Sequence, residues 1–429
     1  MALIWIFVGF FLLLILGIPI AFALGIVSAG YLIIAGGIPL DLIPQRIFAG
    51  IDKYPLMAVP FFILAAELMI EIKILKYIVD LAHALVGHFR SGLAQVNVLN
   101  SVFFAGISGS AIADVGGMGP LEIAMMTEYG YPKPYAAAVT AASAMLGPII
   151  PPSIAVIVYC LVVSEASVSA LLMAGFVPGF MIAFALMITN YVIARKRNYA
   201  AAEKFVGFRK LLIALRNAIL PLLMPAILLG GILLGVFTPT EAAAVACAYA
   251  LFLGFVVLRT LRLKALPGIF YRAGLTTGAV FLIMGTCSAL GWILASLQLA
   301  PVVEKLFRSI SSNPLVFLLL VNIFLLMVGC LLEGTAAIII FMPFLAPLAH
   351  SLGIHPIHFG IVAIVNLMVG LITPPVGLVL YVTCNVARIP LEELLREVWP
   401  YVVVEIIALL ILTYYAPATL FVPKLFGLI

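Results

Sequence analysis

The chain has 429 residues, of which 66% are hydrophobic and 9% charged, and its mean hydropathy is +1.31. Because a soluble domain carries roughly a quarter charged residues, this composition excludes a soluble globule and leaves room for many membrane crossings of about 20 residues each. The net charge is +5, and the five cysteines lie singly in apolar runs. This favours small buried side chains over a disulfide framework or a zinc site.

The first apolar segment, residues 4–35, is too long for a signal peptide and lacks a basic n-region, so we expect a retained membrane helix. Residues 71–90 carry Lys73, Lys76 and Arg90 in an amphipathic pattern that is too polar to cross a bilayer. We expect a helix lying along the interface, with an ordinary loop as the alternative. A counterpart with fewer basic residues occurs near 296–313.

Two apolar regions are interrupted by small and hydroxyl residues. In residues 100–130 the interruption is Gly106-Ile-Ser-Gly-Ser110, and in residues 322–350 it is Glu333-Gly-Thr335. About 15 apolar residues flank each interruption, too few for two full crossings. Each region therefore predicts a re-entrant hairpin that enters the membrane, turns on glycine and leaves by the same face.

Each hairpin is followed by an apolar segment that contains a double proline. Gly147-Pro-Ile-Ile-Pro-Pro152 lies within residues 135–163, and Gly370-Leu-Ile-Thr-Pro-Pro375 lies within residues 357–386. Prolines remove backbone donors, and such a break at membrane depth survives only where it is buried in protein or lines a polar cavity. Paired breaks in two halves indicate the binding site of a transporter.

The two halves of the chain are related by more than the breaks. Pro19 matches Pro239 at an offset of 220, Asn100 matches Asn322 at 222, and the double prolines match at 223. This slow drift predicts an internal duplication into residues 1–215 and 216–429. If each half crosses the membrane an odd number of times, the two repeats have inverted topology.

Basic residues gather in two loops that should lie in the cytoplasm by the positive-inside rule. These residues are Arg195, Lys196, Arg197, Lys204, Arg209, Lys210 and Arg216 in the first loop, and Arg259, Arg262, Lys264 and Arg272 in the second. Two apolar spans, near residues 218–237 and 240–258, separate the loops and return the chain to the same side. Short loops between spans argue against nucleic acid as a partner.

A hairpin tip beside a broken helix would bring together carbonyls, hydroxyls and helix ends. Carbonyl and hydroxyl oxygens suit Na⁺, and the positive N-terminal ends of helices suit an anion. The alternative for Ser108, Ser110 and Thr335 is hydrogen bonding between helices. The intramembrane carboxylates Asp114 and Glu333 are candidates for function, although Glu333 could instead cap a helix.

Other polar residues carry weaker signals. Glu122, Glu128, Glu165 and Glu241 are expected near the membrane interfaces, without a special role. Pro356 interrupts any helix between His355 and His358. The three histidines His350, His355 and His358 therefore favour a solvated turn over a metal site. Because no phosphate loop occurs in the sequence, transport should draw on an ion gradient rather than on ATP.

Four motifs carry a family resemblance that extends over essentially the whole chain. Residues 103–114 (FFAGISGSAIAD), 146–153 (LGPIIPPS), 235–244 (GVFTPTEAAA) and 371–377 (LITPPVG) resemble the large membrane subunit, or M subunit, of tripartite ATP-independent periplasmic (TRAP) transporters. The resemblance implies an all-α polytopic membrane protein of the ion transporter superfamily that works as an elevator in the bacterial inner membrane. It also implies Na⁺-driven uptake of an organic acid, with Na⁺ as the coupling ion and no organic cofactor.

The resemblance implies two protein partners, a soluble periplasmic substrate-binding protein and a small membrane subunit, which we expect to be a separate polypeptide. It also implies a set of site residues. The two Na⁺ sites would use Ser108, Gly109, Ser110, Gly147, Pro148, Glu333, Gly334, Thr335, Gly370 and Thr373. The substrate would contact Ser110, Asp114, Pro152, Ser153, Thr335 and Val376.

The substrate class is left open by these motifs. A shortage of cationic residues around the expected site favours sialic acid over a C4-dicarboxylate. A stand-alone Na⁺- or H⁺-coupled anion carrier, which needs no binding protein, is an alternative. A membrane scaffold or receptor, in which the breaks are only packing features, is another.

Overall fold

The computed structural model describes residues 2–36, 38–72, 74–199, 207–299, 301, 305 and 313–429, and this part of the chain is helical without β-strands. Helices satisfy their backbone hydrogen bonds internally, as the bilayer interior requires. Six helices in the described part are long and apolar enough to cross a membrane, or up to eight if each bent pair counts as one span. The expectation of an all-α polytopic membrane protein is confirmed.

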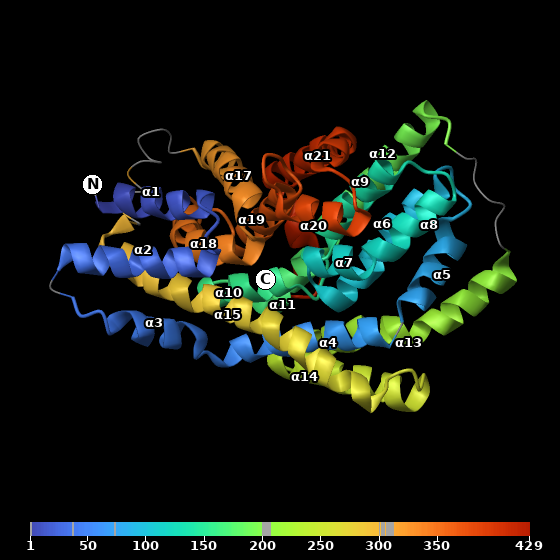
Figure 1. The fold of residues 1–429 in the computed structure, drawn as a ribbon, viewed down its shortest axis with the longest axis horizontal. Helices are drawn as coiled ribbons and strands as arrows, with labels where there is room; N and C mark the ends of the chain where they lie inside the picture. Colours follow the sequence, from blue (N-terminus) through green and yellow to red (C-terminus); the bar gives the residue numbers. More distant parts are fainter. Residues whose placement is uncertain are drawn as a thin grey trace.

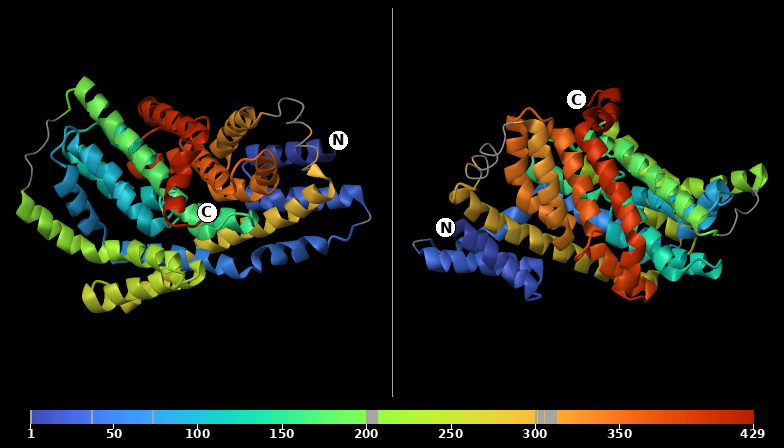
Figure 2. Two further views of the ribbon diagram at one scale, coloured as in Figure 1. Left: turned by 180° about the vertical axis from the view of Figure 1, so that it is seen from behind. Right: turned by 90° about the horizontal axis from the view of Figure 1, so that it is seen from above.

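One group of helices forms a layer of the molecule, which we call the outer layer (Figures 1 and 2). Its helices are α1 (Ala2–Ile15), α2 (Ile20–Ala35), α3 (Leu42–Ile51), α4 (Ala58–Glu71), α13 (Phe208–Leu233), α14 (Pro239–Phe252) and α15 (Leu266–Ser296). Within it, α3 packs along α15, where Gly50 lies against Ser288 and Gly285 lies against Ile47. A Cβ atom on Gly285 would lie 2.8 Å from the Ile47 side chain, so small residues allow these helices to approach closely.

A second group of helices forms what we call the inner bundle. From the first half it contains α6 (Gly92–Ser108), α7 (Ala111–Gly117), α8 (Gly119–Glu128), α9 (Lys133–Ser143), α10 (Ile154–Val162), α11 (Val168–Ala174) and α12 (Phe176–Lys196). From the second half it contains α17 (Pro314–Leu331), α18 (Gly334–Ser351), α19 (Pro356–Leu371), α20 (Leu378–Ala387), α21 (Leu391–Tyr414) and α22 (Ala416–Leu425). Helices α9 and α19 carry the most continuous runs of buried residues.

The first apolar segment differs from the expected single helix. It forms two helices, α1 and α2, which pack against each other. Gly17, with φ +81°, and Pro19 make the turn between them, because glycine accepts the left-handed region and proline removes a helical donor. Residues 71–90 contain the helix α5 (Leu75–Val86), and its position along the interface stays a prediction. Most of its counterpart at 296–313 lies outside the described residues.

Helices at corresponding positions of the expected repeats pack crosswise. In the outer layer, α2 packs against α15 and α14 packs against α4. In the inner bundle, α10 packs against α18 and α20 packs against α7. In each pair, one helix belongs to the first half and the other to the second half. Two repeats related by a two-fold axis would give this arrangement. The repeat boundaries themselves stay a prediction.

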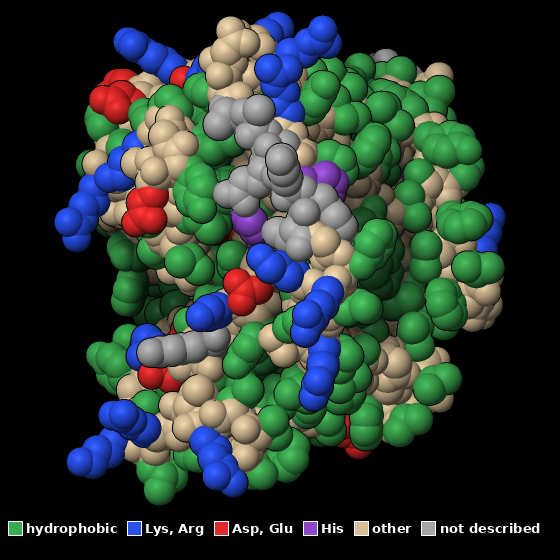
Figure 3. Space-filling view, turned by 90° about the vertical axis from the view of Figure 1, so that its right-hand side faces the viewer, with side chains coloured by type: hydrophobic (Ala, Val, Ile, Leu, Met, Phe, Trp, Pro, Cys, Tyr) green, Lys and Arg blue, Asp and Glu red, His purple; other side chains and the backbone are tan. Residues whose placement is uncertain are grey.

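Basic residues mark one end of the molecule. Helix α12 ends at Lys196 and α13 begins at Phe208, at the right-hand end in Figure 1. Seen from this end, many Lys and Arg side chains lie across the surface, with Asp, Glu and hydrophobic side chains between them (Figure 3). Arg197 pairs with Glu397 at 2.7 Å and Arg272 pairs with Glu67 at 2.8 Å. By the positive-inside rule this end faces the cytoplasm.

Candidate functional site

The first hairpin tip is held against the first helix break by glycine. Helix α6 ends at Ser108, and the chain bends by 118° into α7. Gly109, at the bend, has φ +59°, and a Cβ atom there would lie 2.7 Å from the Pro152 carbonyl oxygen and 3.2 Å from the Ile154 nitrogen. Only glycine therefore lets the tip lie this close to the break.

The first break is buried and has internal hydrogen-bond partners. The chain leaves α9 through a short 3₁₀ turn at Ala144–Leu146 and returns to helix at Ile154. The Ser153 hydroxyl caps α10 by accepting a hydrogen bond from the Val156 amide at 3.2 Å, and it donates to the Pro148 carbonyl. A Cβ atom on Gly147 would lie 3.1 Å from the Ser110 carbonyl oxygen, so the tip and the break also meet there.

The second tip and the second break also meet, through the end of α17. A Cβ atom on Gly370 would lie 2.6 Å from the Gly329 Cα, so α17 and α19 touch backbone to backbone. The Gly377 amide donates to the Cys330 carbonyl at 3.0 Å, which joins the end of α17 to the start of α20. Thr373 is half-buried, and its hydroxyl donates to the Val369 carbonyl at 2.7 Å. Both double prolines have a cis peptide bond.

Glu333 acts as the cap of α18. Its Oε2 accepts hydrogen bonds from the amides of Thr335 at 2.9 Å and Ala336 at 3.1 Å, and also from the Thr335 hydroxyl. The negative side chain thus offsets the positive end of α18. Helix α10 is capped instead by the neutral Ser153, and α20 begins at Gly377 without a side-chain cap. The N-termini of α10 and α20 are therefore better suited to an anion.

A buried polar cluster lies behind the first tip. Asp114 and Glu122 are only 2% and 1% exposed, and none of their four carboxylate oxygens has a hydrogen-bond partner among the described residues. The amide of Asn100 lies beside the Glu122 carboxyl, and the hydroxyl of Ser101 lies beside the Asp114 carboxyl. The expectation that Glu122 lies near an interface is wrong, because α8 packs between α9 and α20.

An asparagine ties each hairpin to the helix that precedes the break. In the first half, Asn97 donates to the Thr140 hydroxyl at 2.7 Å and accepts from the Ser143 hydroxyl at 2.7 Å. In the second half, Asn366 donates to the Asn322 side chain at 2.8 Å. Asn97 thus makes in the first half the kind of contact that Asn322 makes in the second, whereas the sequence offset pairs Asn322 with Asn100.

The histidines following α18 do not share one environment. His350 is exposed and lies 3.9 Å from the Glu165 carboxylate. His355, in the loop between α18 and α19, caps α19, and partial burial together with Lys424 and His350 lowers its pKa. His358 is buried against Thr419 and Thr413, so the expected solvated turn is wrong for this residue.

Comparison with known proteins decides the family. The family model described as "Tripartite ATP-independent periplasmic transporter, DctM component" matches residues 7–418. The chain belongs to this family. As a DctM component it is a transport subunit rather than an enzyme, and a multi-pass protein of the inner membrane.

Similar proteins extend over nearly the whole chain. The sialic acid TRAP transporter large permease protein SiaM of Vibrio cholerae is 43% identical, with 97% of each chain covered. The C4-dicarboxylate TRAP transporter large permease protein DctM of Pseudomonas aeruginosa is 38% identical, with 89% of each chain covered. The crystal structure of the Alcanivorax borkumensis YdaH transporter matches with a TM-score of 0.62 over 87% of each chain, and its 14% identity supports the fold alone.

Proposed function

We propose that this DctM component carries an organic acid inward together with Na⁺, as the membrane path of a tripartite transporter. The observation that supports this most directly is that a hairpin tip touches a helix break in both halves. A Cβ atom on Gly109 would meet the Pro152 carbonyl, and the Cys330 carbonyl at the end of α17 accepts a hydrogen bond from the Gly377 amide. Irregular backbone of this kind exposes carbonyl oxygens at membrane depth, and such oxygens coordinate alkali cations in transporters.

The two Na⁺ sites follow from the grouping of oxygens. At the first contact, the carbonyls of Ser110, Pro148 and Pro152 gather around the tip. At the second, the Gly370 carbonyl accepts from the Thr373 amide at 3.0 Å, next to the Cys330 and Pro374 carbonyls. The other assigned ligands at the tips, Ser108, Gly109, Glu333, Gly334 and Thr335, lie on the same two turns.

The substrate is an anion that binds between the two tips, against Ser110, Asp114, Pro152, Ser153, Thr335 and Val376. No Lys, Arg or His occurs among these assigned residues, so positive charge must come from helix ends and bound Na⁺. This arrangement couples the anion to the cation. Sialic acid is the favoured substrate, because it is the substrate in the name of the 43% identical relative, and a C4-dicarboxylate is the alternative.

Movement is proposed to follow the elevator scheme. The inner bundle holds both tips and both breaks, and crosswise packing of α10 with α18 and of α20 with α7 makes it one unit. The outer layer would act as the scaffold, braced by the small membrane subunit, while a periplasmic substrate-binding protein delivers the acid. Both partners are proposed from the tripartite organisation of the family.

The test is uptake of radiolabelled sialic acid into proteoliposomes that contain this chain and its small membrane partner. Uptake that requires both an inward Na⁺ gradient and the binding protein would support the proposal. Uptake without the binding protein would favour the stand-alone carrier. If sialic acid is not taken up, C4-dicarboxylates are tested in the same way, and failure of both would overturn the proposed substrate class.

A further inference from the structure

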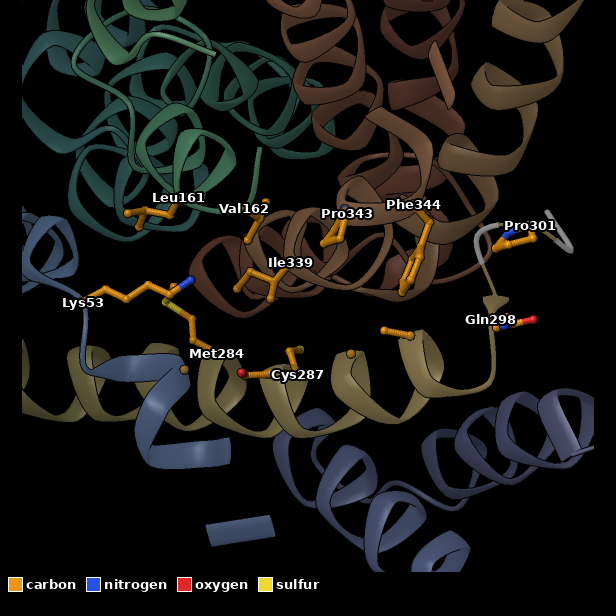
Figure 4. A pocket seen from close by; sticks show the side chains of 14 residues that line it. Lys53, Leu161, Val162, Met284, Cys287, Gln298, Pro301, Ile339, Pro343 and Phe344 are labelled. Carbon is orange, nitrogen blue, oxygen red and sulfur yellow. The ribbon is translucent and has the colours of Figure 1, made fainter. Parts of the chain in front are cut away.

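A cavity of about 580 Å³ lies outside the proposed transport site, between the outer layer and the inner bundle. Helix α15 forms one wall, with Met284, Cys287 and Gly291, and α18 forms the opposite wall, with Ile339 and Phe344 (Figure 4).

The cavity has one positive charge and mostly apolar walls. Lys53 is the only charged residue among the 14 that line it, and it makes no ion pair with any described residue. In Figure 4 its side chain lies at one end of the cavity, and Gln298 lies at the other. Between these two polar ends the wall is formed by aliphatic, aromatic, sulfur-containing and glycine residues, with Ser288 as the one further polar side chain.

The shape of the cavity is elongated. Its wall follows α15 from Met284 to Ala295, a rise of roughly 17 Å along the helix axis. One bilayer leaflet contains about 15 Å of hydrocarbon, so a single acyl chain fits between the two polar ends. A polar, hydroxyl-rich sugar acid would leave most of its hydroxyls without partners against these walls.

We propose that this cavity binds an amphiphile with one acyl chain along α15 and an anionic group at Lys53. The anionic group can belong to a phospholipid or to a free fatty acid, because a phosphate and a carboxylate both suit an unpaired ammonium. One wall belongs to the outer layer and the other to the inner bundle, so the bound chain fills space between the two. Any effect on transport rests on the proposed function, but binding does not.

The test is photolabelling of the full chain, purified with its small membrane subunit and placed in phosphatidylcholine nanodiscs. Three probes carry the same diazirine on the acyl chain: phosphatidylglycerol, a free fatty acid and phosphatidylcholine. We expect an anionic probe to label peptides around residues 284–298 and 339–344. Whether phosphatidylglycerol or the fatty acid labels more strongly identifies the source of the ligand.

The variant Lys53→Met removes the charge and should reduce anionic labelling about fivefold, whereas Lys53→Arg should retain it. Lys424→Met removes an exposed lysine of α22 and is the matched control, expected to label like the original chain. Gly291→Leu places a side chain where a Cβ meets nothing within 4 Å, so it should block the acyl chain without changing charge.

Equal labelling by the neutral and anionic probes would overturn the proposal, because it indicates ordinary contact with the surrounding bilayer. Unchanged labelling in both Lys53→Met and Gly291→Leu would also overturn it. Both readouts are independent of uptake, so a failure of the proposed transport function and a failure of this site can be distinguished.

Discussion

Replacement of Gly109 by alanine tests the contact between the first tip and the first break. The added Cβ would meet the Pro152 carbonyl oxygen at 2.7 Å, and this oxygen belongs to the backbone, which cannot rotate away as a flexible side chain does. The tip and the break must therefore separate by a few tenths of an ångström. Metal–ligand distances in protein sites lie within about 0.2 Å of their preferred values. A displacement of a few tenths of an ångström is therefore enough to lose a ligand.

The expected magnitude has two parts. Alanine in the left-handed region costs about 1–2 kcal/mol, which lowers stability wherever it occurs. Loss of one cation ligand should weaken Na⁺ binding by at least about 1.4 kcal/mol, or tenfold. Gly130→Ala is the matched control, because Gly130 has φ +87° and a Cβ there meets nothing within 4 Å. The control has the backbone strain without the clash.

The assay is the Na⁺ concentration that gives half-maximal uptake, measured with thermal unfolding of the same samples. We expect both variants to unfold at slightly lower temperature, and only Gly109→Ala to need about tenfold more Na⁺. If the two variants show the same Na⁺ dependence, the first tip does not contribute to cation binding.

Three further substitutions test particular contacts. Asn97→Ala removes hydrogen bonds to Thr140 and Ser143 and should cost about 0.6–1.7 kcal/mol in thermal stability; a larger loss would mean that helix packing depends on them. Glu122→Met replaces a buried carboxyl without a hydrogen-bond partner and should stabilise the folded protein by about 1–3 kcal/mol. A lower unfolding temperature would show instead that a bound cation satisfies the Glu122 carboxylate. Arg197→Ala should cost less than about 1 kcal/mol, because the Arg197–Glu397 pair is partly exposed. The hydrogen bond to Tyr199, and after it the interaction with Glu397, raises the pKa of Arg197, so the guanidinium stays charged. The stability lost in Arg197→Ala should therefore be constant between about pH 6 and 9, and a change in that window would contradict this.

The elements that the sequence predicted best are those with strong local signals. Glycine at a hairpin tip and paired prolines in an apolar segment each determine backbone geometry locally, so the bend at Gly109 and the breaks at Pro152 and Pro375 could be placed within a few residues. The turn at Gly17–Pro19 had the same kind of signal, but continuous hydrophobicity on both sides concealed it.

Tertiary packing determined the features that the sequence did not reveal. Whether Glu122 faces solvent or the bundle depends on how α8 packs between α9 and α20, which no local pattern encodes. Asn97 and not Asn100 makes the hydrogen bonds to Thr140 and Ser143, although both side chains are buried. A sequence offset cannot distinguish them, because residues three apart lie on nearly the same face of a helix.

The two contacts between tips and breaks are not equivalent, and this difference suggests an order of events. The first break is buried and lies beside the neutral cap Ser153, whereas at the second Pro375 is exposed and Thr373 and Val376 are half-buried. Glu333 brings negative charge to the second tip, which favours a cation there and disfavours an anion before that cation binds. In the proposed carrier, Na⁺ at the second tip therefore precedes the substrate, whose carboxylate then meets the N-terminus of α10. Neutralising Glu333 as Glu333→Gln keeps a capping oxygen and should weaken this order, so substrate affinity should depend less on Na⁺ concentration than in the original chain. An unchanged dependence would show that the charge of Glu333 is used only to cap α18.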